Sequence, residues 1–225
     1  MEDLTILFLT VNKVPKAWAE YHKKVLLEAA GSYPIISISR EPIELGTNLI
    51  QEEPISCSNV YRQMLRGAKL ATTPYVAMAE DDTLYPREHF VFYRPPLDTF
   101  AYNRTLWALF TWRRPTYSWK TRKSNSTLIA PREALIKALE ERFAKYPDGI
   151  PPKWAGELGR DTIERRMGVT IQKSVEVFSK TPVVLFHHDY EMDLLAVKHR
   201  KRPFYIQAYD IPYWGKAEEL VKNFK

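Results

Sequence analysis

The sequence predicts an α/β domain with a mostly parallel sheet, because strand-like and helix-like segments alternate from the N-terminus. Residues 4–11 form a continuous apolar run, the pattern of a strand that is buried on both faces of a sheet. A segment with apolar side chains at helical spacing, 18–30, and a second strand-like run, 35–39, follow it. Strand, helix and strand at this spacing begin a βαβ unit, in which the two strands run parallel.

The next segments continue this pattern and end in a group of acidic residues. A helix is expected over about 59–71, where serines stand in position to cap it and apolar side chains share one face. A third apolar run, 74–79, ends directly in Glu80, Asp81 and Asp82. Ligands of open α/β sheets bind outside the carboxyl ends of strands, so we expect the three acids to lie in a site.

The chain beyond residue 86 is richer in aromatic residues and less regular. Strands are expected within 107–112, 117–119, 126–130 and 181–186, and helices over 131–146 and 161–167. With 225 residues, no internal repeat, and only 8 Gly against 16 Pro, the chain is expected to fold as one domain.

The composition indicates a globular protein inside the cell. Apolar residues make up 45% and charged residues 27% of the chain, which is ordinary globular usage. The first apolar run lacks the basic flank and the length of a signal peptide, so we expect a cytoplasmic protein, in the host cytoplasm if the chain is viral. The single cysteine, Cys57, excludes an internal disulfide, and we expect it to be a small buried apolar residue.

The acidic residues at 80–82 are the main candidates for chemistry. Crowded carboxylates repel one another and lose hydration when buried, and a divalent cation between them is the simplest remedy. Oxygen ligands favour Mg²⁺ or Mn²⁺, and both ions also bind phosphate oxygens. The alternative is a surface turn, where aspartate is common.

The stretch from Ser56 to Asp82, read as helix, strand and acidic triplet, resembles family 2 and related GT-A glycosyltransferases. In that family a helix with a basic residue and an apolar strand lead into an Asp-x-Asp motif. Here Glu80 replaces the first Asp, and its longer side chain must take a different position. The resemblance covers residues 4–90 well and the remainder loosely. It implies a Rossmann-like three-layer α/β/α sandwich over residues 1–225, with 1–90 binding a nucleotide sugar and 91–225, including the C-terminal tail, binding the acceptor.

The resemblance also implies roles for individual residues. Around the donor it implies Thr10, Asn12 and Glu41 near base and ribose, Ser58 and Arg62 facing the nucleotide, Glu80 and Asp81 at ribose or sugar, and Asp82 and His187 on the metal. His188 is the alternative ligand, and a structural histidine is the other interpretation of either residue. Glu157 or Asp161 would be the catalytic base, unless they cap a helix. The implied cofactor is Mn²⁺ or Mg²⁺, and the implied donor is a UDP-sugar, with UDP-glucose as first candidate.

Aromatic and basic residues alternate in 112–123, as they do in grooves that bind nucleic acid. The candidate acceptor-binding residues are Trp112, Arg113, Arg114, Trp119, Lys120 and Arg122. If DNA is the acceptor, a hydroxymethylated base would be flipped out to reach the donor, as in phage enzymes that modify DNA with glucose. A glycan platform, or a solvated basic surface, explains the same residues.

The sequence therefore predicts a metal-dependent hexosyltransferase that moves a sugar from a UDP-sugar to a hydroxyl of a modified DNA base or of a glycan. The alternative from another class is a non-catalytic nucleic-acid-binding protein that uses the basic and aromatic face. A nucleotidyltransferase is disfavoured because no Gly-rich phosphate loop follows the first strand. The sequence does not choose between inversion and retention at the anomeric carbon.

Overall fold

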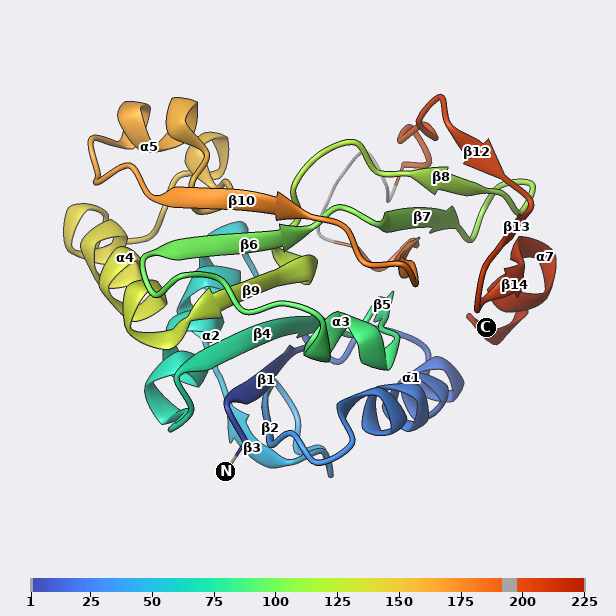
Figure 1. Ribbon diagram of the computed structural model, residues 1–225, viewed down its shortest axis with the longest axis horizontal. Coiled ribbons are helices and arrows are strands. Elements are labelled where there is room, and N and C mark those ends of the chain that lie inside the picture. The colour runs from blue at the N-terminus through green and yellow to red at the C-terminus, as the bar shows by residue number, and fades with distance from the viewer. Residues whose placement is uncertain (1, 192–197, 225) are drawn as a thin grey trace.

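The computed structural model describes residues 2–191 and 198–224 and is built around a seven-stranded sheet (Figure 1). Its strands are β1 (Leu4–Leu9), β2 (Ile35–Ser39), β3 (Thr47–Ile50), β4 (Tyr75–Glu80), β6 (Thr99–Asn103), β9 (Leu128–Pro131) and β10 (Lys173–Val177). They lie in the order β10-β6-β9-β4-β1-β2-β3, and only β9 runs antiparallel to its neighbours. The predicted α/β class with a mixed, mostly parallel sheet is confirmed.

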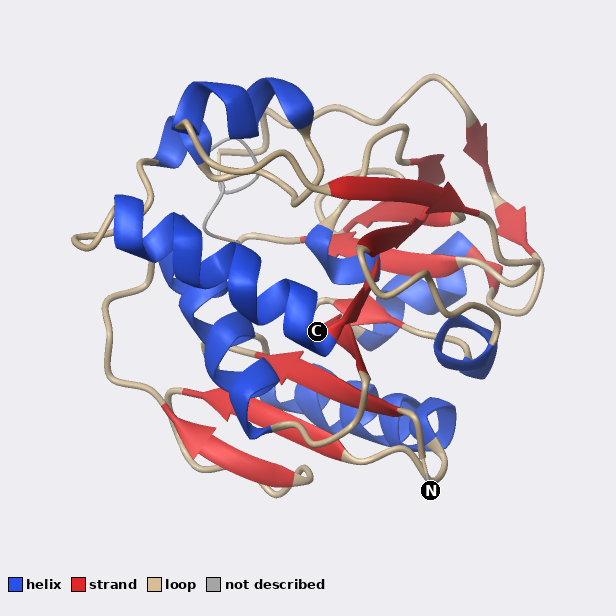
Figure 2. Cartoon of the chain, turned by 60° about the vertical axis from the view of Figure 1, so that its left-hand side comes forward, coloured by secondary structure: helices blue, strands red, loops and turns tan. Residues whose placement is uncertain are grey.

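Helices cover both faces of this sheet, which makes the predicted three layers (Figure 2). Helices α1 (Lys16–Ala30) and α3 (Arg87–Val91) lie on one face, and α2 (Cys57–Leu70) and α4 (Arg132–Lys145) on the other. The reason lies in β1, whose alternate side chains point to opposite faces. Leu7 and Leu9 pack with the core under α2 and α4, whereas Ile6 and Phe8 pack with the core under α1.

A second sheet lies beside the first, at the carboxyl ends of β4 and β6. Its strands are β5 (Thr83–Leu84), β7 (Leu106–Phe110), β8 (Tyr117–Trp119), β11 (Val183–His187) and β12 (Gln207–Ala208), in the order β12-β8-β7-β11-β5. The remaining elements are η1 (Asn125–Thr127), η2 (Pro152–Trp154), α5 (Asp161–Met167), β13 (Asp210–Ile211), β14 (Gly215–Lys216), α7 (Ala217–Leu220) and η3 (Val221–Asn223). Among the residues that the structure describes, no helix is long and apolar enough to cross a membrane.

The link between the two sheets is the feature that matters for function. Strand β4 belongs to the large sheet and β5 to the small one, so Asp81 and Asp82 form the crossover between them. Strand β11 pairs with β5, and the N–H of Phe186 donates a 2.8 Å hydrogen bond to the carbonyl of Asp82. The carboxyl ends of β4 and β11 are therefore held together, although about 100 residues separate them in the chain.

Candidate metal centre

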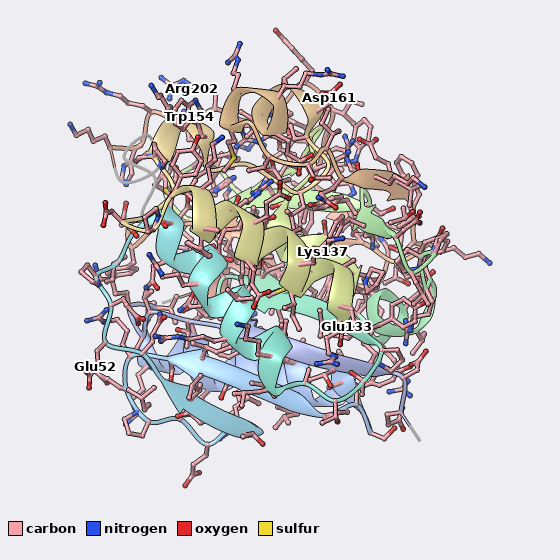
Figure 3. All side chains as sticks on the ribbon, turned by 90° about the vertical axis from the view of Figure 1, so that its left-hand side faces the viewer. Glu52, Glu133, Lys137, Trp154, Asp161 and Arg202 are labelled. Atoms are coloured by element: carbon pink, nitrogen blue, oxygen red, sulfur yellow. The ribbon has the colours of Figure 1, made fainter. Side chains whose placement is uncertain are left out.

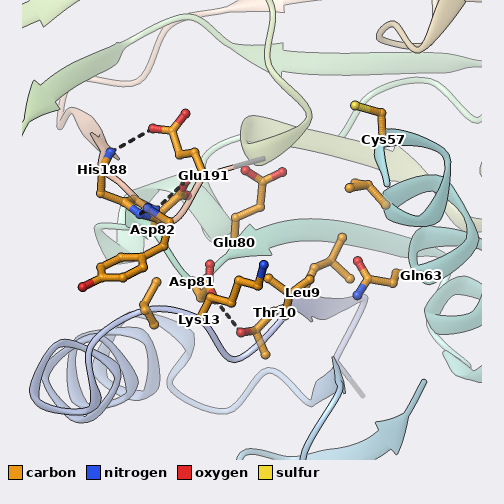
Figure 4. Close-up of a pocket in the computed structure, with 14 residues that line it drawn as sticks. Leu9, Thr10, Lys13, Cys57, Gln63, Glu80, Asp81, Asp82, His188 and Glu191 are labelled. Atoms are coloured by element: carbon orange, nitrogen blue, oxygen red, sulfur yellow. Dashed lines mark hydrogen bonds and ion pairs between the residues drawn. The ribbon is translucent and has the colours of Figure 1, made fainter. Parts of the chain in front are cut away.

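Three side chains from these two strand ends could hold a metal ion. One ligand atom from each of Asp82, His188 and Glu191 lies within 4.8 Å of the others, and His188 Nε2 stands 3.7 Å from Asp82 Oδ2 (Figure 4). Two carboxylates and one imidazole suit Mn²⁺, and they also suit Mg²⁺ where oxygen ligands dominate. The chemistry of this set fits the divalent cation that the sequence predicted.

The neighbouring histidine, His187, is the last residue of β11 and is not part of this cluster. Its Nδ1 lies 2.7 Å from Glu191 Oε1, and its ring packs on Phe110. The geometry favours His188 as the ligand and gives His187 the task of orienting Glu191, a supporting contact of the kind that metal sites use.

The candidate ligand Glu191 was not predicted from the sequence. Besides His187, its carboxylate accepts a hydrogen bond from the N–H of His188 at 3.0 Å, and its other oxygen lies 3.3 Å from Lys201 Nζ. A turn after the strand brings it back beside His188. The run His-His-Asp-Tyr-Glu directly after the last apolar strand is the signal that could have identified it.

The acidic triplet is electrostatically strained without a cation. Burial, reinforced by the charge of Asp82, raises the pKa of Glu80 to about 8 and that of Asp81 to about 7. Burial would also raise the pKa of Asp82, but its contact with His188 outweighs burial and lowers that pKa. A group of acids that partly keep their protons near neutral pH is one in which a divalent cation can replace those protons.

The backbone of the triplet is fixed by buried partners. The hydroxyl of Tyr85 accepts a 3.0 Å hydrogen bond from the N–H of Glu80 and donates one of 2.9 Å to the carbonyl of Ser126. The carboxylate of Asp81 accepts from the hydroxyl of Thr10, and its carbonyl accepts from Trp18 Nε1 at 2.7 Å. These contacts hold the acids in place before any ligand arrives.

A pocket of about 450 Å³ opens beside the triplet (Figure 4). Lys13 lies at one side, and Cys57 and Gln63 approach from α2. Cys57 is exposed, so the expectation of a buried apolar cysteine is wrong. Gln63 is buried, and its Nε2 has no hydrogen-bond partner in the described part of the chain. An unpaired buried amide beside a pocket is a donor that a bound molecule can satisfy.

A second pocket, of about 530 Å³, adjoins the first on the α1 side of the sheet. Thr10, Asn12 and Glu41 line it together, as the resemblance implied, and Thr10 and Asp81 line both pockets. Asn12 has a left-handed backbone, with φ of 56°, and its Oδ1 accepts hydrogen bonds from the N–H groups of Arg40 and Glu41. The loops after β1 and β2 are thereby tied together around this pocket.

The structure does not bring Ser58 and Arg62 to either of these pockets, as far as the described residues show. Ser58 Oγ accepts a 2.9 Å hydrogen bond from the N–H of Ile150, and Arg62 donates one of 2.8 Å to the carbonyl of Pro147. The helical period explains this, because α2 turns these positions toward α4 while Cys57 and Gln63 face the pocket. Both residues stabilise the chain after α4.

The predicted catalytic acids also lie elsewhere. Glu157 pairs with Arg160 at 3.6 Å, and Asp161, the first residue of α5, pairs with Arg165 and is 55% exposed (Figure 3). Within residues 2–191 and 198–224, neither side chain lines the two pockets beside the triplet.

Of the predicted acceptor residues, Arg114 and Arg122 are exposed and Lys120 is buried, and the others, Trp112, Arg113 and Trp119, are half-buried. Trp112 stacks on His199, with ring centroids 4.7 Å apart, and Arg114 lies 5.3 Å over the ring of Tyr209. Trp112 and Arg114, both from the β7–β8 turn, therefore lie against side chains of the segment after residue 198.

The remaining two candidates, Trp119 and Lys120, have partners inside the protein. Trp119 donates a hydrogen bond of 2.8 Å to the carbonyl of Arg104. Lys120 is 6% exposed; burial, with the charge of Arg122, lowers its pKa to about 8, while the charge of Glu80 opposes that shift. Lys120 is therefore a cation electrostatically coupled to the acidic triplet rather than a surface contact.

Comparison with known proteins gives similarities of fold only. No protein-family model matches the chain, and no curated protein matches its sequence. Among solved structures, a glycosyltransferase involved in glycosylation of the major capsid of PBCV-1 is 13% identical, with 82% of this chain and 92% of that chain covered at a TM-score of 0.47. A Drosophila β1,4-galactosyltransferase 7 mutant in complex with manganese, UDP-Gal and xylobiose is 12% identical, with 91% and 82% covered at 0.44. The bifunctional IspDF of Campylobacter jejuni is 10% identical, with 80% and 50% covered at 0.46.

Proposed function

We propose that the protein is a metal-dependent glycosyltransferase that uses a nucleoside-diphosphate sugar. The observation that carries this proposal is the cluster of Asp82, His188 and Glu191 on the wall of the first pocket, next to Asp81, which lines both pockets. A cation held by this cluster would meet the diphosphate of a donor that extends from the first pocket into the second.

The two pockets suit the two ends of such a donor. The pocket with Asn12 and Glu41 has apolar side chains from β1 and from the loop after β2 for a base, and a carboxylate for ribose hydroxyls. The pocket with Lys13 and Gln63 would receive the sugar and part of the diphosphate. Thr10 lines both pockets and stands at the crossing point.

The reaction would be displacement of the diphosphate at the anomeric carbon, with oxocarbenium character. A bound cation supplies Lewis-acid stabilisation of the leaving diphosphate. Lys13 lines the pocket and adds positive charge there, and the buried Lys120 partly compensates the negative charge of Glu80. Glu80, which lines the pocket, replaces Glu157 and Asp161 in our proposal as the carboxylate that takes the acceptor proton, since a base must reach the proton that it removes.

For the acceptor, we propose a hydroxymethylated DNA base as first candidate and a glycan as second. The net charge of +6 and the stacked pair Trp112–His199 beside Arg113 and Arg114 support a nucleic acid. UDP-glucose remains the first donor to test. A non-catalytic nucleic-acid-binding protein would use the same surface but has no need of the acid cluster.

Donor binding can be tested through Cys57, the only cysteine of the chain, because it is exposed and lines the pocket. UDP with Mn²⁺ is expected to slow labelling of the thiol and to raise the melting temperature, because a ligand of the native state stabilises it by mass action. Asp82→Asn should abolish both effects. Asp161→Asn, the same substitution at an exposed aspartate that lines neither pocket, should keep them. If neither UDP nor another nucleoside diphosphate has these effects with Mn²⁺, the proposed donor site is wrong.

The acceptor is tested separately by transfer of radiolabelled glucose. UDP-glucose is supplied with hydroxymethylated DNA, with unmodified DNA of the same sequence, and with simple glycans. Label on the hydroxymethylated DNA alone supports the first candidate, and label on glycans alone supports the second. Salt-sensitive DNA binding without donor dependence, and no transfer to any acceptor, would favour the non-catalytic alternative.

A further inference from the structure

Four rings pack together directly behind the candidate metal centre, and one of them comes from the end of the chain. The rings of Trp18, Phe186, His188 and Phe224, called the aromatic wedge below, come from α1, β11, the turn after it, and the residue after η3. Ring centroids of Phe224 lie 4.6 Å from Trp18, 5.5 Å from Phe186 and 4.8 Å from His188. Phe224 is 8% exposed, so it is a buried part of the core.

The aromatic wedge contacts the acidic triplet and also contains the candidate ligand His188. Trp18 is fully buried, packs on Phe186 with ring centroids 4.5 Å apart, and donates a hydrogen bond of 2.7 Å to the carbonyl of Asp81. His188 presents its Nε2 toward Asp82 while its ring packs on Phe224. A displacement of Phe224 would therefore reach the histidine directly and the acidic triplet through Trp18.

An imidazole has two rotatable bonds, and something must fix both for its nitrogen to point at a cation. For His188, the N–H of Tyr190 lies 3.2 Å from Nδ1, which is a long contact for an orienting hydrogen bond. The ring also packs against Phe224, with the two ring planes 31° apart, and close packing leaves a buried ring few orientations. Supporting contacts of metal ligands typically change affinity by about 10- to 100-fold.

We propose that Phe224 is a positioning residue for His188, so that the C-terminal segment from α7 to Phe224 is a structural part of the metal centre. This inference rests on the metal site of the proposed function. The segment is anchored independently of Phe224, because Ala217 and Leu220 are buried and the N–H of Ala217 donates to the carbonyl of Tyr209 at 2.9 Å. Removal of one ring can therefore loosen the histidine without releasing the segment.

The test compares three variants of the full chain without any nucleotide present. Phe224→Ala removes the ring, Phe224→Tyr keeps it, and Phe143→Ala is the control, since Phe143 is a partly buried phenylalanine on α4 under Arg62. Free Mn²⁺ is measured by its electron paramagnetic resonance signal during titration. We expect about 10-fold weaker Mn²⁺ binding in Phe224→Ala, and wild-type binding in the other two.

A second readout in the metal-free protein separates this inference from the proposed function. The imidazole resonances of His188, assigned through His188→Gln, should shift and broaden in Phe224→Ala and stay unchanged in Phe143→Ala. Equal Mn²⁺ affinity in wild type and folded Phe224→Ala would overturn the inference. If the wild type binds no Mn²⁺, the proposed metal site fails, and unchanged His188 resonances in Phe224→Ala would then overturn the positioning role as well.

Discussion

The half-buried acid Glu80 gives a prediction about stability that needs no substrate. Its pKa is raised from 4.5 to about 8 by burial and by the charge of Asp82, so the folded protein holds a proton that the unfolded chain has lost. Between these two values the folded state binds more protons than the unfolded state. The free energy of unfolding of the metal-free protein should therefore fall as pH rises from 4.5 toward 8.

The magnitude follows from the shift and from the exposure of the group. Each pKa unit corresponds to ~1.4 kcal/mol, but Glu80 is only half-buried, and solvent screening reduces the effect to about 1–3 kcal/mol. Glu80→Gln has no charge to lose, so it should be more stable than wild type by about this amount at pH 8 and equally stable at pH 4.5. Mn²⁺ should reduce the difference, because a cation stabilises the ionised carboxylate.

The assay is urea unfolding followed by tryptophan fluorescence at several pH values, with and without Mn²⁺. Glu52→Gln is the control, since Glu52 is an exposed glutamate that lines neither of the two pockets (Figure 3). If the stabilities of wild type and Glu80→Gln run parallel across this pH range, the electrostatic account of the triplet is refuted.

Three further changes have defined outcomes. Tyr85→Phe removes the hydroxyl that joins Glu80 to Ser126, so the buried N–H and carbonyl lose their partner, and urea unfolding should show a loss of about 1–3 kcal/mol. Asp3→Asn breaks an ion pair with Arg94, whose hydrogen bonds lower the pKa of Asp3; the loss of about 0.5 kcal/mol should be present above pH 3.8 and should disappear below the lowered pKa. Gln63→Leu should weaken donor binding in the Cys57 labelling assay by about tenfold, and unchanged protection of the thiol would show that the amide contacts no ligand.

The central strands and the acid triplet were predictable because their signals are local. The apolar runs at β1, β2 and β4 are continuous since each strand is buried on both faces, and an acid run after such a strand can be read directly. Strands β3, β6 and β10 of the large sheet were missed. Strands β3 and β10 lie at its edges and carry exposed polar residues, and the buried strand β6 has a polar residue at each end, Thr99 and Asn103, so none of the three has a long apolar run. The predicted strand at 126–130 begins as the 3₁₀-helix η1 for the same lack of a distinguishing period.

Several assignments within the site depended on the direction of a side chain. His188 rather than His187 places its Nε2 near Asp82, and the sequence does not say which of two adjacent histidines points toward the acids. Gln63 rather than Arg62 faces the pocket because the rotation of α2 about its axis is set by packing against α4. Cys57 is exposed for the same reason.

By itself, the sequence determined the fold class, the order of the central elements and the position of Glu80, Asp81 and Asp82 at the end of β4, because short-range hydrophobic patterns fix these features. Only the tertiary structure decided that His188 and Glu191 complete the cluster and that Phe224 packs behind it. About 100 positions of the chain separate Asp82 from His188, and more than 30 separate His188 from Phe224. These contacts exist only because β11 pairs with β5 and because the end of the chain packs against α1. Neither pairing leaves a local pattern in the sequence.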